Sequence, residues 1–277
     1  MSGGRINWYP GHVNKARREI AKAMPKVDLV MEVLDARIPR SSSNPLVPEL
    51  RGEKPFLKIL NKADLADPGA TGTWLRHLEN EPGVRAIAVQ KDKLKEVKAL
   101  LDVARGMLPD RRKGGRPILA MILGIPNVGK STLINTMCGK AIAKVGNRPA
   151  VTQHQARIKA AKDFVLLDTP GFLWPRLDPP VCGSNLAVTG AIKDAVLDLD
   201  EIAFFAARYM VERYPGLLVD KYKLEKSDHE PYELLEHIGA RRGCLGRGGM
   251  LDLQKASEIF LRELRAGSVG RLTLEWP

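Results

Sequence analysis

The sequence has few cysteines, no long apolar run and fewer acidic than basic residues. Its 277 residues include three cysteines, which lie far apart and have no Cys or His partner at the spacing of a zinc site: Cys138, Cys182 and Cys244. This pattern argues against a disulfide framework and against a structural metal site. We therefore expect a protein of a reducing compartment.

Segments for secretion or membrane insertion are also missing from the pattern. The stretch Met1 to His12 has no apolar core of the kind that a signal peptide needs. The longest uninterrupted apolar stretch, around Ile118 to Ile125, is far shorter than a membrane span. We therefore expect a cytoplasmic protein with no membrane span.

Basic residues are in clear excess. The chain has 44 Lys and Arg against 32 Asp and Glu, a formal net charge of +12, while 44% of its residues are hydrophobic. The excess therefore belongs to a globular chain rather than to a disordered tail. It favours a polyanionic partner such as nucleic acid, although basic soluble proteins are common and charge alone specifies no partner.

Short apolar runs rich in Val, Ile and Leu alternate with helical patterns in the first part of the chain. Runs without polar alternation are typical of strands that are buried on both faces, so we predict an α/β fold with a mostly parallel sheet. The predicted strands are Val27–Leu34, Pro55–Leu60, Val84–Val89, Ile118–Leu123 and Phe164–Leu167.

The pattern changes after Gly171, where strand signals stop. Apolar residues recur at helical spacing over Asn185–Arg213 and over Leu253–Leu264, and Gly267 is expected just past the end of the last helix. We predict an α/β domain over residues 1–175, with a basic N-terminal segment over 1–26, and a smaller all-α domain over 176–277. Within the first domain, Pro109–Pro117 is predicted to be a basic linker.

A phosphate-binding loop follows the fourth predicted strand. Gly124 to Ser131 reads G-I-P-N-V-G-K-S, which fits G-x-x-x-x-G-K-[ST] between a strand and a helix predicted over Thr132–Cys138. Its backbone N–H groups face phosphates, Lys130 supplies a catalytic cation and the Ser131 hydroxyl reaches Mg²⁺. The nucleotide contacts predicted here are Asn127, Val128, Gly129, Lys130, Ser131 and Thr132.

A second nucleotide motif ends the fifth predicted strand. Asp168-Thr169-Pro170-Gly171 places a carboxylate at the end of an apolar run, followed by a turn. We expect Asp168 to hold Mg²⁺ through water and the Gly171 N–H to contact the γ-phosphate. By itself this motif is weak evidence for nucleotide binding, and its position after the phosphate loop makes the evidence stronger.

A base-reading motif, Asn61-Lys62-Ala63-Asp64, ends the second predicted strand. An Asp carboxylate accepts hydrogen bonds from guanine N1–H and from its exocyclic amine, whereas adenine would leave the carboxylate unpaired. The motif precedes the phosphate loop, while in most GTPases it follows. Because a sheet's strand order does not depend on where the chain begins, we predict a circularly permuted P-loop GTPase.

The permuted pattern resembles the YlqF/RbgA family of ribosome-assembly GTPases over nearly the whole chain. In addition to the three motifs above, the resemblance is carried by Trp8 to His12, Asp35 to Pro39, Asn44-Pro45 and Arg148 to Thr152. It weakens in the C-terminal third. It implies late assembly of the large (50S) ribosomal subunit as the function, with the particle stimulating GTP hydrolysis.

The resemblance also implies roles for single residues. Thr152 would join Ser131 on Mg²⁺ when GTP is bound, and Asn127 would lie beside a potassium ion, a candidate second cation. The family usually has Gly at the position of Ala150, a departure within the switch segment. Further contacts to the base are expected at Gln90 and Lys91, largely from the backbone.

Hydrolysis by the isolated protein should be slow. Phe172 stands where Ras-like enzymes place a water-orienting glutamine, and an apolar ring cannot polarise water. The resemblance offers His12 as the missing catalytic group. A histidine after Pro-Gly is also compatible with a turn or an RNA contact.

Basic residues outside these motifs suggest RNA binding. Those of the N-terminal segment fit either a solvated helix face or an RNA surface next to Trp8 and Tyr9. The predicted RNA-binding residues are Lys15, Arg17, Arg18, Arg241, Arg242 and Arg247.

We therefore expect GTP and GDP as ligands and the large ribosomal subunit with its rRNA as the partner. Because the helical part follows the Asp168–Gly171 turn directly, GTP should favour docking on the particle and GDP release. Two rival functions stay open: an RNA-binding assembly protein whose nucleotide site only gates binding, and a translation-related GTPase. The sequence leaves the oligomeric state open.

Overall fold

The computed structural model describes residues 10–90, 93–110, 115–143, 156–171, 173, 179–225, 229–246 and 250–277, with side chains from residue 17 onward. Within these ranges the strands are β1 (Leu29–Asp35), β2 (Phe56–Asn61), β3 (Val84–Ala88), β4 (Ile118–Gly124), β5 (Ala156–Ala161) and β6 (Phe164–Asp168). The helices are α1 (Pro10–Ala23), η1 (Met24–Lys26), α2 (Pro39–Ser42), α3 (Val47–Arg51), α4 (Pro68–Leu78), α5 (Leu94–Gly106), α6 (Lys130–Cys138), α7 (Val181–Val188), η3 (Asp194–Val196), α8 (Leu199–Arg213), α9 (Pro215–Tyr222), α10 (Pro231–Arg241) and α11 (Leu253–Arg265).

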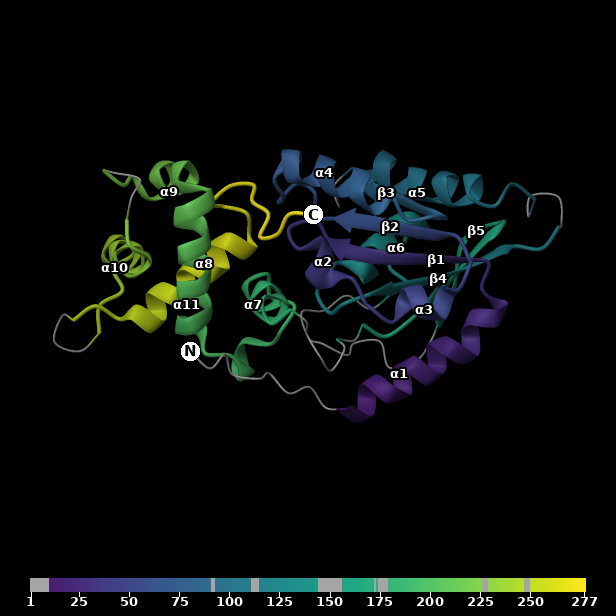
Figure 1. The fold of residues 1–277 in the computed structure, drawn as a ribbon, viewed down its shortest axis with the longest axis horizontal. Coiled ribbons are helices and arrows are strands. Elements are labelled where there is room, and N and C mark those ends of the chain that lie inside the picture. The colour runs from purple at the N-terminus through teal and green to yellow at the C-terminus, as the bar shows by residue number, and fades with distance from the viewer. Residues whose placement is uncertain are drawn as a thin grey trace.

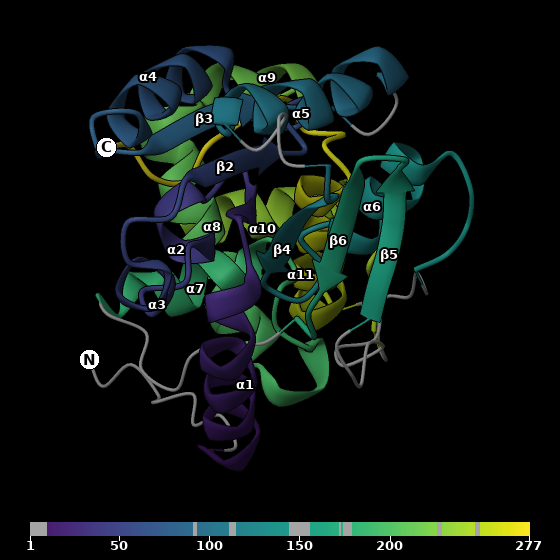
Figure 2. The same cartoon turned by 90° about the vertical axis from the view of Figure 1, so that its right-hand side faces the viewer.

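The six strands form one sheet in the order β3-β2-β1-β4-β6-β5. All neighbouring pairs are parallel except β5 and β6, which are antiparallel. The mostly parallel α/β sheet is confirmed, and each of the five predicted strands is present with ends shifted by one or two residues. Figure 2 shows β5 as the edge strand beside β6.

Strand β5 was not predicted from the sequence because of its burial pattern. Ile158 is buried, whereas its neighbours Arg157 and Lys159 are exposed. The strand therefore alternates between a packed and a solvated face, as an edge strand does, and it has no continuous apolar run.

The two faces of the sheet are covered by different helices. On one face, Leu29, Met31 and Ile122 pack in the same buried cluster as side chains of α5 and α6. On the other face, Val30 and Met121 pack with Ile20 of α1. Figure 1 shows α1 along the lower edge of this part of the molecule, with α4 and α5 along the upper edge.

The C-terminal part is helical and lies at one end of the sheet (Figure 1). Its described residues form helices and belong to none of the six strands, as predicted, but one predicted helical stretch was wrong in detail. Asn185–Arg213 is interrupted because Gly190 takes a left-handed φ of +78° after α7, and Asp198 then caps α8 with its side chain. Gly267, with φ +74°, follows the end of α11 as predicted.

The last residues return from α11 to the sheet part, as Figure 1 shows. Leu274 donates its N–H to the carbonyl oxygen of Arg37 at 2.8 Å, and Trp74 Nε1 donates to the carbonyl oxygen of Glu275 at 2.9 Å. Leu272 and Leu274 join the same buried cluster as the strands. The helical part therefore packs on the sheet through a shared core. In the described ranges, no helix is long and apolar enough to cross a membrane.

Candidate functional site

The carboxyl ends of three parallel strands carry the predicted nucleotide motifs. Asn61 ends β2, Gly124 ends β4 and Asp168 ends β6. Since the carboxyl ends of parallel strands meet at one edge of the sheet, the fold gathers motifs that are far apart in sequence. This edge is the candidate site.

The phosphate loop and the base-reading loop are in direct contact. Asn61 Nδ2 donates to the carbonyl oxygen of Val128 at 2.8 Å. Gly129 has φ +92°, and a Cβ built there would lie 2.4 Å from Asn61 Nδ2. Glycine is therefore required at position 129 both by its backbone conformation and by the close approach of Asn61.

Lys62 also connects the base-reading loop to the phosphate loop. Its ammonium donates to the carbonyl oxygen of Asn127 and to Asp35 Oδ2, each at 2.8 Å. Both Lys62 and Asn127 have a φ of +59°, which places each in the left-handed region. These bonds fix the direction of the Lys62 side chain across the site.

Asp35 is the buried anion that holds Lys62. Arg37 Nε donates to Asp35 Oδ1 at 2.9 Å and Arg37 Nη2 to Oδ2 at 2.8 Å, which makes a bidentate pair. Burial alone would raise the pKa of Asp35, but the charges and hydrogen bonds of Arg37 and Lys62 lower that pKa well below its usual value. Asp35 is therefore ionised at neutral pH.

Asp64 offers an acceptor to the site. Its Oδ1 atom is buried and has no hydrogen-bond partner in the described part of the chain, and the same holds for Asn61 Oδ1. An unsatisfied buried acceptor costs about 1–3 kcal/mol. A ligand that brings N–H donors to this loop would remove that cost, and the guanine edge carries such donors.

The other predicted phosphate and metal residues also lie together. Lys130, at the first turn of α6, forms a buried ion pair with Asp168 at the end of β6. A Cβ on Gly171 would lie 3.3 Å from the carbonyl oxygen of Gly124, so the turn after Asp168 packs against the phosphate loop. Ser131 and Thr132 follow in the first turn of α6.

The helical part contacts the phosphate loop as well. Asn127 Nδ2 donates to the carbonyl oxygen of Gly190, just after α7, at 2.8 Å. Arg265 of α11 supports the same turn, because its guanidinium donates to the carbonyl oxygens of Val188 and Ala187 at 3.0 and 2.9 Å. Asn127 thus joins the nucleotide loop to the second part of the chain.

The C-terminal tail supports the base-reading loop, a contact that was not predicted from the sequence. Arg271 Nη2 donates to the carbonyl oxygen of Ala63 at 3.0 Å, and its Nε donates to that of Ala66 at 2.9 Å. Leu272 N–H donates to the carbonyl oxygen of Leu65 at 3.0 Å. A single arginine in a short segment without a hydrophobic pattern gives no sequence signal for this contact.

Several predicted residues lie outside what the structure describes. Lys91, Thr152 and Arg247 are outside the described residues, as is Phe172. His12 and Lys15 lie in α1 with only their backbone described. Gln90 is described, and it is half-buried just beyond β3.

Three of the four described members of the predicted RNA-binding set make contacts within the chain. Arg17 pairs with Glu49 at 3.4 Å, and both side chains are largely exposed. Arg241 donates to the carbonyl oxygen of Tyr222 at 2.9 Å, and Arg242 pairs with Glu263. Arg18 is exposed. Arg241 and Arg242 therefore help to hold the helical part together.

Residues 119–238 match the family described as "50S ribosome-binding GTPase". The chain is 44% identical to the ribosome biogenesis GTPase A of Bacillus cereus, over 98% of this chain and 94% of that protein. It is 31% identical to the probable ribosome biogenesis GTPase A of Mycoplasma pneumoniae, over 99% of this chain and 97% of the relative.

Two solved structures share the fold over almost the full length. The GNP-bound crystal structure of YlqF from T. maritima has a TM-score of 0.66 at 28% identity and covers 95% of this chain and 98% of its own. The GDP-bound structure of YlqF has a TM-score of 0.64 at 28% identity and covers 94% of this chain and 99% of its own.

Proposed function

Because this chain belongs to the ribosome biogenesis GTPase A family, we propose that it binds GTP, hydrolyses it to GDP and acts in the assembly of the large ribosomal subunit. One observation carries the choice of nucleotide. Among the residues that the structure describes, Asp64 Oδ1 is buried without a hydrogen-bond partner, in a loop that Asn61 ties to the phosphate loop.

Guanine selection follows from the donors that each purine offers. Asp64 accepts from guanine N1–H and from the exocyclic amine, so the base supplies the donors that the loop lacks. Adenine has an unprotonated N1, so it would leave the carboxylate desolvated and unpaired. Sites built on such hydrogen bonds discriminate by several orders of magnitude.

Phosphate binding is assigned to the loop and to the α6 N-terminus. The backbone N–H groups around Gly129 face the anion, and Lys130 brings a positive charge to the β- and γ-oxygens. Lys130 would then exchange part of its contact with Asp168 for a contact with phosphate. The buried carboxylate of Asp168 stays close by.

Mg²⁺ fits the donor set of this site. Ser131 offers a hydroxyl and Asp168 a carboxylate, which are the oxygen ligands that Mg²⁺ prefers, and Thr152 is proposed to add a second hydroxyl when GTP is present. When bound, Mg²⁺ neutralises charge on the β- and γ-phosphates. K⁺ is proposed as a second cation beside Asn127.

We propose that the free protein hydrolyses GTP slowly because Phe172 offers no group to orient the attacking water. Hydrolysis is proposed to accelerate when the large subunit completes the site. His12 is the residue proposed to orient water in that state. Its removal should lower particle-stimulated turnover while leaving GTP affinity unchanged.

The partner is proposed to be the large subunit through its rRNA, with the protein in the cytoplasm. The net charge of +12 supports a polyanionic partner. We also propose that residues 1–175 and 176–277 act as two functional units, and that the hydrogen bond from Asn127 to Gly190 couples the phosphate loop to the helical unit. GTP would favour docking and GDP release.

The test is turnover of GTP and of ATP by the purified protein, with and without large subunits, in potassium and in sodium. We expect GTP turnover to be slow alone, to rise with large subunits and to exceed ATP turnover under every condition. Lack of GTP turnover under all conditions would overturn the enzymatic function. Equal particle affinity with GDP and with a non-hydrolysable GTP analogue would overturn the switch, because a ligand without differential affinity shifts no equilibrium.

A further inference from the structure

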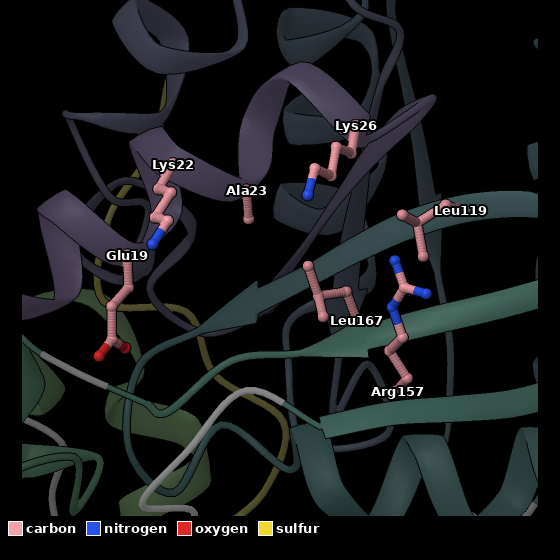
Figure 3. Close-up of a pocket in the computed structure, with 7 residues that line it drawn as sticks. All are labelled: Glu19, Lys22, Ala23, Lys26, Leu119, Arg157 and Leu167. Carbon is pink, nitrogen blue, oxygen red and sulfur yellow. The ribbon is translucent and has the colours of Figure 1, made fainter.

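A hollow of about 370 Å³ opens between α1 and the β5 edge of the sheet, on the face that carries Val30 and Met121. We call it the α1–β5 groove (Figure 3). The residues that line it are Glu19, Lys22, Ala23, Lys26, Leu119, Arg157 and Leu167.

The strands explain why the groove has an apolar floor. Arg157 of β5 and Leu167 of β6 are register partners, so their side chains leave the sheet on the same face. The buried cluster on that face joins Leu167 with Ile20 and Met24, and Leu119 packs against it. Helix α1 therefore covers the face up to β6, and the strip in front of β5 forms the hollow.

The groove walls are positively charged on both sides. Lys22 and Lys26 come from the helical side and Arg157 from the strand side, and all three are exposed. Figure 3 shows Lys26 and Arg157 on opposite sides of Leu119 and Leu167, with Glu19 away from Arg157. The lining thus has three cations and one carboxylate.

These cations differ from most arginines of the fold in lacking internal partners. No side-chain hydrogen bond or ion pair of Lys22, Lys26 or Arg157 is present in the described ranges. By contrast, Arg105 pairs with Asp163 at 2.9 Å, and Arg116 pairs with Asp28 at 3.2 Å. Exposed cations without an internal carboxylate are available to an external anion.

We propose that the α1–β5 groove binds the phosphate backbone of an unpaired RNA segment, with one nucleoside against Leu119 and Leu167. The volume is near the lower end of the range for small-ligand sites, about 300–1,000 Å³, which suits one nucleotide unit and not a duplex. The cations on the two sides of the groove contact the flanking phosphates. The apolar face of an unstacked base packs against the aliphatic floor.

The groove is also close in the chain to the nucleotide site. Leu167, on its floor, directly precedes Asp168, which pairs with Lys130. RNA in the groove therefore contacts the strand that carries the predicted metal-linked carboxylate. This inference rests on the proposed function, since it names the RNA surface of the same GTPase.

The experiment compares two triple variants of equal charge change in the full chain. The groove variant is Lys22→Ala, Lys26→Ala and Arg157→Ala. The control variant is Arg76→Ala, Lys95→Ala and Lys98→Ala, which removes three exposed cations from α4 and α5, at the opposite edge of the sheet part from α1 in Figures 1 and 2. Binding to protein-free large-subunit rRNA and to intact large subunits is measured over a series of salt concentrations, together with GDP affinity.

We expect the groove variant to bind rRNA at least tenfold more weakly near 0.1 M salt, and the slope of log affinity against log salt to fall by about 2, since each phosphate contact to single-stranded RNA contributes about 0.7. The control should stay within about twofold of the wild type with an unchanged slope. GDP affinity should be retained in both variants, which shows that the nucleotide fold is intact.

Three results would overturn the groove proposal while leaving the proposed function standing. They are an unchanged slope in the groove variant, an equal loss in the control variant, and a loss on intact subunits but not on protein-free rRNA. The last result would assign the groove to an acidic protein segment. If the wild type binds neither rRNA nor the particle, the proposed function fails together with the groove.

Discussion

Arg271 donates from Nη2 to the carbonyl oxygen of Ala63 at 3.0 Å, so the C-terminal tail holds the residue next to Asp64. The same guanidinium binds the carbonyl oxygen of Ala66, and Leu272 N–H binds that of Leu65. Of the four carbonyl groups from Ala63 to Ala66, all but that of Asp64 are therefore fixed by the tail. The position of the carboxylate that we propose to read guanine therefore depends on residues that are more than two hundred positions away in sequence.

Arg271→Ala should weaken base recognition more than phosphate recognition. We expect GDP affinity to fall about tenfold, equivalent to about 1.4 kcal/mol, because two hydrogen bonds from a charged donor are lost at an exposed side chain. Inosine diphosphate (IDP) lacks the exocyclic amine that Asp64 is proposed to bind, so the affinity for IDP should fall less. The measurement is the ratio of GDP affinity to IDP affinity, which should decrease.

Arg262→Ala is the matched control for Arg271, since Arg262 is exposed on α11 and has no side-chain contact with the loop in the described ranges. It should leave both affinities unchanged. An equal loss of GDP and IDP binding in Arg271→Ala would contradict a role in placing Asp64.

Asp64→Asn should shift base preference from guanine toward xanthine. Xanthine has a carbonyl oxygen where guanine has its amine, and an asparagine can donate to that oxygen while accepting from N1–H. We expect GDP affinity to fall at least about a hundredfold and the ratio of XDP to GDP affinity to rise. Competition of unlabelled GDP and XDP against a fluorescent nucleotide would show it, and an unchanged ratio would contradict the assignment of Asp64.

Gly129→Ala should abolish tight nucleotide binding. The new Cβ would lie 2.4 Å from Asn61 Nδ2, and the residue would keep a φ of +92°, so the loop must move or strain. Gly106→Ala is the control, because nothing lies within 4 Å of a Cβ at that helical glycine. It should keep GDP affinity and leave stability unchanged or raise it by up to about 1 kcal/mol. Equal GDP affinity in both variants would show that the Asn61 contact is dispensable.

The sequence predicts the sheet and the meeting of its motifs because the signals are local. The five predicted strands are continuous apolar runs, and the motif positions follow from the carboxyl ends of parallel strands. The fit of Asn61 to the phosphate loop could be expected for the same reason.

Contacts between distant, unpatterned segments were not predictable. Nothing in the short run after Gly267 indicates that Arg271 supports the base loop, and no local pattern pairs Asn127 with Gly190. Strand β5 escaped detection because Arg157 and Lys159 alternate with Ile158. Tertiary packing decides these features, so they required the structure.

Asp35→Asn should destabilise the fold strongly at neutral pH. The substitution leaves Arg37, with a side chain only 3% exposed, and Lys62 without their shared anion. Removing one partner of a buried ion pair costs about 3–5 kcal/mol. Asp102→Asn is the control, since that carboxylate is 77% exposed in its pair with Arg105 and should matter by less than about 1 kcal/mol.

The pH dependence of the same variant gives a second check. Because Arg37 and Lys62 hold the pKa of Asp35 below its usual value, the unfolded chain takes up a proton at Asp35 at a higher pH than the folded chain does. The stability that Asp35 contributes is therefore fully present above about pH 5 and is lost as the pH falls below about 4. Urea unfolding of the wild type and of Asp35→Asn is measured from pH 8 to pH 3. The difference between their free energies of unfolding should be constant from pH 8 to about pH 5 and should become smaller below about pH 4. A difference that persists unchanged to pH 3 would contradict the ionised state of Asp35 as its source.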